Sequence, residues 1–270
     1  MQKKNRLVFM LIACAATCVA GLLWAEKSSF SKVDEKETYT LQSSENALEI
    51  PQLPANRKER LLRHTGYAVS FNPEWNIPNW VAYELTEAET YGKRPRTNLF
   101  TADPDAPGCP ETWDYSSSGW DRGHMAPAGD MKWDTIAMRE SFYLSNVCPQ
   151  NHNLNKGDWN YLEEKVRNMA RKYGNVYVCC GPIVTATDSL IGKQHRIVVP
   201  QAFFKALLWQ TNGQWTAAGF CFRNEAGHRD LKAYALTVDS LEKLTGMDFF
   251  PALDDAEENE VESVLDLKFF

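Results

Sequence analysis

The chain has 270 residues, of which 44% are hydrophobic and 12% aromatic. This composition excludes an intrinsically disordered chain, and the length allows one domain of about 200 residues plus its ends. The formal net charge is −6. Any affinity for nucleic acid therefore has to come from a local basic groove, because phosphate contacts dominate that affinity.

The first residues have the pattern of a targeting segment. Lys3, Lys4 and Arg6 precede an uncharged, mostly apolar run over residues 7–25. This pattern favours a cleaved signal peptide first, an uncleaved membrane anchor second and a lipoprotein with Cys14 as the lipidated residue third. We therefore expect export, to a periplasmic, secreted or membrane-anchored location, with residues 26–56 as a polar linker.

The elements from residue 57 onward predict an α+β domain. Aromatic and β-branched runs indicate strands at residues 67–71, 80–85, 175–180, 196–200, 203–209 and 216–222, with a hairpin turn at Asn212-Gly213. Helices are predicted within residues 134–145 and over 155–173 and 236–244, and residues 90–107 are predicted to form a surface loop. The expected architecture is a central, mostly antiparallel sheet flanked by helices.

The domain is expected to span residues 57–253, followed by an acidic C-terminal tail over residues 254–270. The tail has seven acidic residues between Asp254 and Asp266. A solubilising end is the first interpretation, and an autoinhibitory mimic of a nucleic-acid strand is the second.

One short motif contains a candidate general base. Asp121-Arg122-Gly123-His124 places an acid, a cation, a flexible backbone position and an imidazole in succession. An imidazole with a pKa near 6.5 can accept a proton from water at neutral pH, and Arg122 offers donors suited to phosphate. Asp121 is expected to shape the turn. A single histidine is more often structural, so the interpretation depends on its surroundings.

A second stretch places polar groups on a predicted helix. Asn155, Trp159, Glu163 and Arg167 recur every four residues and are expected to drift along one face. That face can present a metal-binding amide, a carboxylate and a cation. Taken alone, Glu163 and Arg167 could simply form a surface salt bridge of a few tenths of a kcal/mol, but together with the upstream histidine the functional interpretation is favoured.

Together these stretches resemble the DNA/RNA non-specific endonucleases of the ββα-metal (His-Me finger) superfamily. The resemblance includes the Asp-Arg-Gly-His motif with the Met-Ala-Pro that follows it, and residues 141–146 and 149–150. It also includes Asn155, Trp159, Leu162 and Glu163 of the predicted metal-binding helix. Residues 64–67, 78–81 and 245–251 match the opening and closing segments, so the resemblance runs from about residue 57 to 253 in one consistent order. It implies a ββα element with His124 on a strand and Asn155 at the head of the helix.

The resemblance also implies a mechanism for hydrolysis of DNA and RNA with little sequence specificity. Asn155 would bind one Mg²⁺, with Mn²⁺ as a substitute, and Glu163 would hold a metal-bound water. His124 would deprotonate the attacking water. Arg167, with Arg96 as a weaker candidate, would stabilise negative charge in the transition state, and Arg122 would position groups at the rim.

Two other functions are compatible with these residues. One is a nucleic-acid-binding protein that keeps the fold without turnover, and the other is a metal-dependent phosphoesterase acting on other phosphodiesters. Preference for DNA or RNA and the oligomeric state, including a homodimer, are left open by the sequence.

The remaining histidines and the cysteines give weaker signals. His152 lies close enough to the metal segment to touch substrate or metal, whereas His64 is expected to be structural. Residues 26–270 contain an odd set of cysteines, and a Cys109–Cys148 disulfide is one hypothesis. Cys179 and Cys180 are expected to face opposite sides of a strand. No Cys-x-x-Cys pair occurs, which argues against a structural zinc site.

Overall fold

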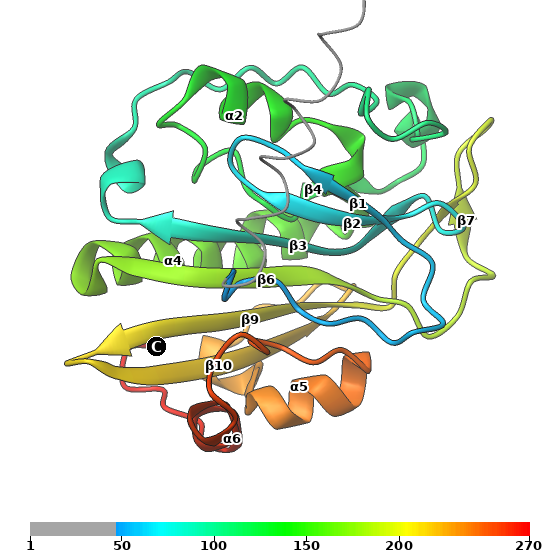
Figure 1. The fold of residues 1–270 in the computed structure, drawn as a ribbon. Coiled ribbons are helices and arrows are strands. Elements are labelled where there is room, and N and C mark those ends of the chain that lie inside the picture. Colours follow the sequence, from blue (N-terminus) through cyan, green and yellow to red (C-terminus); the bar gives the residue numbers. More distant parts are fainter. Residues whose placement is uncertain (1–46) are drawn as a thin grey trace, which may run out of the picture. The chain divides into compact units, whose positions relative to one another are not determined.

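The computed structural model describes residues 47–270, and residues Leu48 to Phe270 form one compact unit. Its centre is a seven-stranded sheet in which every pair of neighbouring strands is antiparallel (Figure 1). The strands in spatial order are β1 (Arg60–Arg63), β2 (Ala68–Asn72), β3 (Ile77–Thr86), β6 (Asn175–Ile183), β9 (Ala202–Thr211), β10 (Gln214–Arg223) and β11 (Ala235–Leu236). The predicted α+β class with a mostly antiparallel sheet is confirmed.

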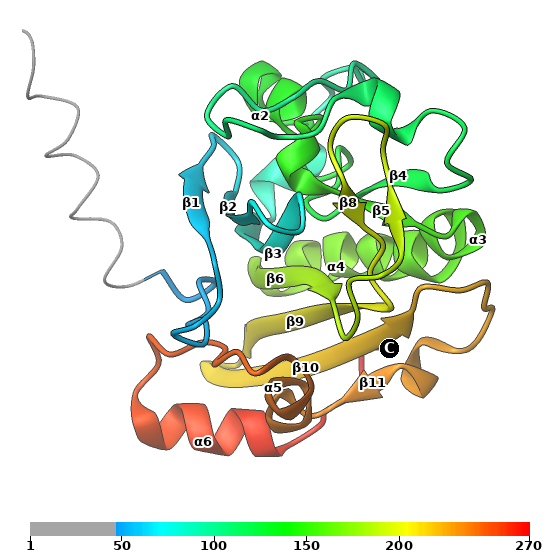
Figure 2. The same ribbon diagram turned by 90° about the vertical axis from the view of Figure 1, so that its right-hand side faces the viewer.

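Helices cover both faces of this sheet because its central strands are apolar on both sides. In β6, Val178 and Cys180 pack into one core and Cys179 into the other, as expected for adjacent strand residues. The first core lies under α4 (Asn160–Tyr173), and the second lies under α5 (Val238–Thr245) and α6 (Asp255–Ser263). Figure 2 shows the sheet between these two layers.

A ββα element lies on the α4 face. β4 (Asp121–His124) pairs with β5 (Val147–Gln150), and the chain continues through α3 (His152–Leu154) and the π-helical turn η4 (Asn155–Trp159) into α4. The predicted single helix over residues 155–173 is wrong in its first turn. Gly157 has non-helical backbone angles (φ −99°, ψ −110°), so Asn155 belongs to a turn that is kinked away from α4.

Short elements complete the α4 face. They are α2 (Thr135–Glu140), the 3₁₀ turns η1 (Ala88–Tyr91), η2 (Thr112–Tyr115), η3 (Leu144–Asn146) and η5 (Leu231–Ala233), and the small pair β7 (Leu190–Ile191) and β8 (Ile197–Val198). The Asn212-Gly213 turn joins β9 to β10 as predicted, with positive φ at both residues. The predicted strand over residues 196–200 is reduced to β8.

Both ends of the predicted domain differ from expectation. Residues 48–56 belong to the compact unit, where Leu48, Ile50 and Leu53 pack against the second core. The acidic tail is not a free end, because α6 buries Val261 and Glu262 and packs on β10. Among residues 47–270, no helix is long and apolar enough to cross a membrane. The predicted targeting segment, residues 1–25, lies outside the described residues.

The predicted Cys109–Cys148 disulfide is wrong. Cys109, Cys148, Cys179, Cys180 and Cys221 are all free thiols in the described part of the chain. The first four are buried among apolar side chains. Burial raises the pKa of the Cys148 thiol well above its ordinary value and that of Cys109 to about 12. These thiols therefore act as small apolar core groups.

Candidate active site

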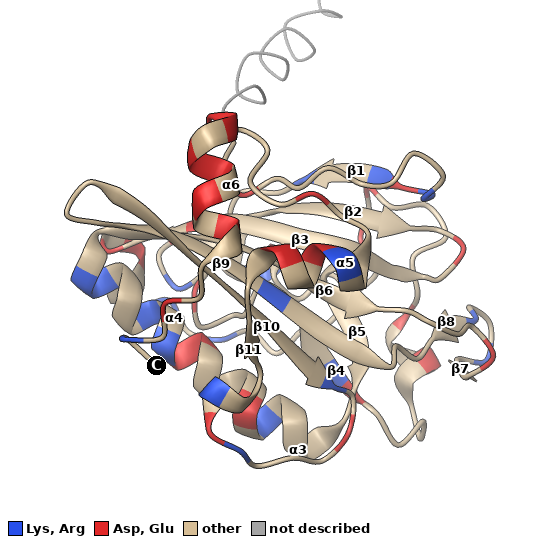
Figure 3. Ribbon diagram, turned by 90° about the horizontal axis from the view of Figure 1, so that it is seen from below, with Lys and Arg blue, Asp and Glu red and all other residues tan. Residues whose placement is uncertain are grey.

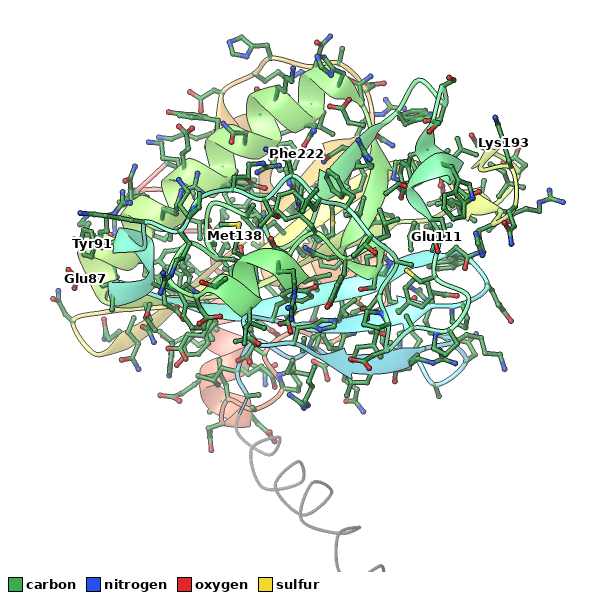
Figure 4. The ribbon with its side chains drawn as sticks, turned by 90° about the horizontal axis from the view of Figure 1, so that it is seen from above. Glu87, Tyr91, Glu111, Met138, Lys193 and Phe222 are labelled. Atoms are coloured by element: carbon green, nitrogen blue, oxygen red, sulfur yellow. The ribbon has the colours of Figure 1, made fainter. Side chains whose placement is uncertain are left out.

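A cleft of about 860 Å³ opens beside β4 and α4. The loop that follows η1, the turn marked by Glu87 and Tyr91 in Figure 4, forms one wall. Asn155 and the first turns of α4 form another. All six residues predicted for the site line this cleft: Arg96, Arg122, His124, Asn155, Glu163 and Arg167.

The cleft is strongly basic although the whole chain is acidic. Seven basic side chains line it, namely Lys93, Arg94, Arg96, Arg122, Lys132, Lys156 and Arg167. Within residues 47–270, Glu163 is the single acidic side chain of the lining. Clefts lined by one sign of charge concentrate ligands of the opposite sign, so this cleft favours a polyanion.

His124 ends β4 with its ring held between aromatic side chains. Its ring centroid lies 4.9 Å from that of Phe142 and 5.1 Å from that of Phe100. The Nε2 atom is buried and has no hydrogen-bond partner among the described residues. Burial, with Arg96 and Arg122 nearby, lowers the pKa of His124 to about 3. The imidazole is therefore neutral at pH 7 and has a free lone pair.

The two arginines beside His124 stack on the same aromatic rings. The guanidinium carbon of Arg96 lies 4.9 Å from the Phe142 ring centroid, and that of Arg122 lies 4.3 Å from the Phe100 centroid. Both arginine side chains are exposed. Stacking fixes the planes of the guanidinium groups while their N–H donors stay available for phosphate.

Asn155 is oriented by the first residue of the motif. Its Nδ2 donates to Oδ2 of Asp121 at 2.9 Å. Since a carboxylate only accepts hydrogen bonds, the amide carbonyl oxygen points elsewhere and is available to a ligand in the cleft. Burial would raise the pKa of Asp121, but hydrogen bonds from Asn155 and His152 hold it below its usual value. The predicted role of Asp121 in a turn is wrong: it is the first residue of β4 and an acceptor for Asn155.

His152 also contacts the Asp121 carboxylate, from a position outside the cleft. Its Nδ1 lies 3.1 Å from both Asp121 oxygens, its side chain is 56% exposed, and it is not part of the cleft lining. His64 lies in a buried hydrogen bond with Asp103 at 3.0 Å, which matches the expected structural role.

Glu163 is buried at the floor of the cleft, with 8% of its surface exposed. Burial raises the pKa of Glu163 to about 7, while Lys205 opposes the shift and Asp130 adds to it. Trp159, one turn earlier on the helix, is not in the cleft. Its indole lies in the core and donates to the backbone oxygen of His124 at 3.3 Å. This contact ties the helix to β4.

Arg167 is fixed by a carboxylate that the sequence did not identify as part of the site. Its Nη1 donates to Oδ1 of Asp130 at 2.7 Å, and Asp130 is fully buried and also accepts from the Tyr83 hydroxyl at 2.9 Å. A Cβ at Gly129 would lie 2.8 Å from Nη1 of Arg167. The glycine therefore leaves the space in which the guanidinium lies. The alternative interpretation, a Glu163–Arg167 surface salt bridge, is not among the ion pairs of the described residues.

Lys205 is a second residue that sequence reasoning missed. It lies on β9 with no exposed surface, and its Nζ has no hydrogen-bond partner within the described chain. Its Nζ lies 4.4 Å from the Trp159 ring centroid. A lysine in the apolar run of residues 203–209 was the available signal, since lysine is almost never fully buried without a partner.

The comparisons with known proteins agree with this geometry. The sequence pattern of the DNA/RNA non-specific endonuclease family matches residues 44–256. The chain is 33% identical to the nuclease EXOG, mitochondrial, of Xenopus laevis, over 90% of this chain and 71% of that protein. It is also 33% identical to nuclease C1 of Cunninghamella echinulata var. echinulata, over 78% and 90%.

Two further similarities involve endonuclease G. The human mitochondrial endonuclease G is 32% identical over 71% of this chain and 70% of its own length. A solved complex of EndoG with EndoGI contains a chain that is 27% identical to this one, with a TM-score of 0.69. That match covers 74% of this chain and 89% of the other.

Proposed function

The chain belongs to the DNA/RNA non-specific endonuclease family, whose members are metal-dependent endonucleases, and we propose that it hydrolyses both DNA and RNA with Mg²⁺. The observation that carries this proposal is the convergence of His124, Asn155 and Glu163 on one cleft with seven basic side chains. A neutral base, an oxygen donor and phosphate-binding cations are the groups that phosphodiester hydrolysis needs.

His124 is the general base in this proposal. Because Nε2 is buried, we assign the other ring nitrogen, Nδ1, as the atom that takes the proton of the attacking water. Two nearby arginines contribute to the low pKa of the ring. A phosphate bound to Arg96 and Arg122 neutralises that influence, so the imidazole becomes a stronger base when substrate is present.

The residues present fit a divalent cation such as Mg²⁺. Mg²⁺ keeps several of its waters and is held by few protein oxygens, and here the Asn155 carbonyl and the Glu163 carboxylate line the same cleft. Asn155 would bind the ion directly, and Glu163 would orient water of its hydration shell. The bound ion would supply positive charge to the scissile phosphate and the leaving oxygen. Mn²⁺ is expected to replace Mg²⁺.

The other charged side chains of the site position the substrate or stabilise the negative charge of the transition state. Arg167, fixed by Asp130, and Arg96 stabilise the negative charge that develops on the phosphate. Arg122 orients the substrate at the rim. Lys205 does not reach the substrate; it is a positioning residue whose charge favours the ionised form of Glu163. Asp121 has the same kind of role for Asn155.

Cleavage assays on plasmid DNA and structured RNA test the proposal. We expect the purified protein to cut both polymers with Mg²⁺, and we expect EDTA, His124→Ala and Asn155→Ala each to remove the activity. His228→Ala and Asn153→Ala are the controls, because both side chains are exposed and outside the cleft. A folded wild-type protein that cuts neither polymer would refute the proposal. Cleavage of one polymer alone would retain the mechanism and reject the dual substrate.

Export, membrane attachment through residues 7–25 and homodimer formation are separate proposals. The basic and then apolar start of the chain supports export, whereas several relatives are named mitochondrial. To test these proposals, residues 1–46 can be fused to a reporter enzyme, and the fusion protein analysed by cell fractionation and N-terminal sequencing. The result distinguishes a cleaved signal peptide from a membrane anchor and from a mitochondrial targeting sequence. Light scattering on the purified protein tests the dimer.

A further inference from the structure

A second group of carboxylates lies on the opposite face of the sheet from the cleft. Asp239 and Glu242 belong to α5 and Glu262 to α6, and these two helices are neighbours. One oxygen from each carboxylate lies within 4.8 Å of the others. Figure 3 shows acidic residues gathered on α6 and on α5, while basic residues mark α4.

Glu262, the most buried of the three carboxylates, indicates that the group binds a ligand. Glu262 is 5% exposed, and its Oε1 is buried without a hydrogen-bond partner among the described residues. A buried oxygen with no partner costs free energy, and a buried carboxylate beside two others costs more. Such an atom needs a proton or a cation next to it.

Further acidic residues next to Glu262 add negative charge to this group of carboxylates. Glu258, one turn before Glu262 on α6, also has a buried Oε1 without a partner in the described unit. The carboxylates of Glu242, Glu258 and Asp248 lie close enough to Glu262 to repel its negative charge. Among the described residues, Lys243 of α5 is a cation near Glu242, and its side chain is exposed. One exposed lysine does not balance the negative charge of these carboxylates.

We propose that Asp239, Glu242 and Glu262 form a calcium site that joins α5 to α6. Ca²⁺ accepts six to eight oxygen ligands at about 2.3–2.6 Å, so oxygens on opposite sides of one ion lie about 4.6–5.2 Å apart. The spacing of the three carboxylates is compatible with that limit. Mg²⁺ usually takes one or two carboxylates and keeps its waters, and zinc prefers nitrogen and sulfur ligands, which this cluster lacks within residues 47–270.

The site would stabilise the fold and take no part in cleavage. A calcium ion would offset two of the negative charges of the cluster and fasten α6, which packs on β10, to α5. Because it lies on the other face of the sheet from His124, the site acts on stability and leaves the nuclease reaction unchanged.

Calcium titration calorimetry on the full chain tests the proposal. The Asn155→Ala background removes the proposed catalytic ligand, so that one calcium per chain should remain. On this background, Glu262→Gln and Asp239→Asn should each weaken calcium binding at least tenfold. Glu260→Gln is the matched control, because it makes the same change on an exposed face of α6. Saturating calcium should raise the unfolding midpoint of the parent and the control by about 5 °C.

Several outcomes would overturn the assignment. They are an Asn155→Ala chain that binds no calcium, calcium binding that Glu262→Gln and Asp239→Asn leave unchanged, and tighter binding of Mg²⁺ than of Ca²⁺ at this site. If the Glu262 variant fails to fold, Asp239→Asn decides, because Asp239 is only half-buried. Glu262→Gln in the otherwise unchanged chain should retain full Mg²⁺-dependent activity.

Discussion

The Nζ atom of Lys205 lies 4.4 Å from the centroid of the Trp159 ring, fully buried in the core beneath the cleft. The charge of Lys205 lowers the pKa of Glu163, against the burial that raises it to about 7. An ammonium group with no hydrogen-bond partner in the described structure is costly to the fold. We therefore expect Lys205 to contribute to the reaction in the cleft and not to the stability of the fold.

Lys205→Met should make the protein more stable and less active. Replacing a buried ammonium group that lacks a hydrogen-bond partner by an apolar side chain of similar length is expected to stabilise by about 1 kcal/mol or more, measured by urea unfolding. Without the lysine the pKa of Glu163 rises further, so a larger fraction is protonated at pH 7. The acidic limb of the kcat/KM profile should move to higher pH, with activity at pH 7 reduced roughly tenfold.

Lys232→Met, at an exposed lysine of η5, is the control for that experiment. A Lys205→Met protein with an unchanged pH profile would show that the lysine has no influence on Glu163.

Asp121→Asn should weaken the use of Mg²⁺. An asparagine at 121 can donate as well as accept, so the Asn155 amide is no longer forced to present its carbonyl oxygen to the cleft. Loss of a group that orients a metal ligand typically costs about 10- to 100-fold in metal affinity or activity. The Mg²⁺ concentration for half-maximal cleavage should rise accordingly. Asp188→Asn, at an exposed loop residue, should change nothing, and an unshifted Mg²⁺ curve for Asp121→Asn would contradict the role.

Gly129→Ala should displace Arg167 without unfolding the protein. The added Cβ would meet Nη1 at 2.8 Å, and the guanidinium is the movable end of a long side chain. We expect a change in the free energy of unfolding below about 1 kcal/mol. A displacement of about 1 Å in a catalytic group can cost up to about 100-fold in kcat. Equal kcat values for Gly129→Ala and the wild type would show that Arg167 does not need this position.

Substrate affinity should depend on salt and on the basic lining of the cleft. A plot of the logarithm of the DNA-binding constant against the logarithm of the salt concentration has a slope set by the number of phosphates that the protein neutralises. Each substitution that removes one phosphate contact should reduce this slope by about 0.9 for duplex DNA. Lys93→Ala and Lys156→Ala should therefore raise KM at low salt and leave kcat nearly unchanged. Lys243→Ala removes a lysine from α5, on the opposite face, and should leave both unchanged. Slopes that are identical for all three variants would place the nucleic acid elsewhere.

Much of the site was predictable because its residues lie in two short stretches. His124 and Asn155 follow from the Asp-Arg-Gly-His motif and the segment about thirty residues later, and the structure brings both to one cleft with Glu163, Arg167, Arg96 and Arg122. The spacing of four residues placed Glu163 and Arg167 on one helical face correctly. It failed for Asn155, because Gly157 breaks the regular helix between Asn155 and α4. It failed for Trp159 because its indole packs in the core and does not line the cleft.

The sequence by itself determined the fold class, and its motifs, through their resemblance to the family, identified six of the side chains that meet in the cleft, since strand alternation and short motifs are local properties. Only the tertiary structure decided which groups support them. Asp130 reaches Arg167, and Lys205 reaches Trp159, across segments far apart in the chain. Packing likewise decided that Cys109 and Cys148 stay unbonded and that acidic α6 folds onto β10. Such pairings depend on which faces the sheet brings together, and local residue patterns do not contain that information.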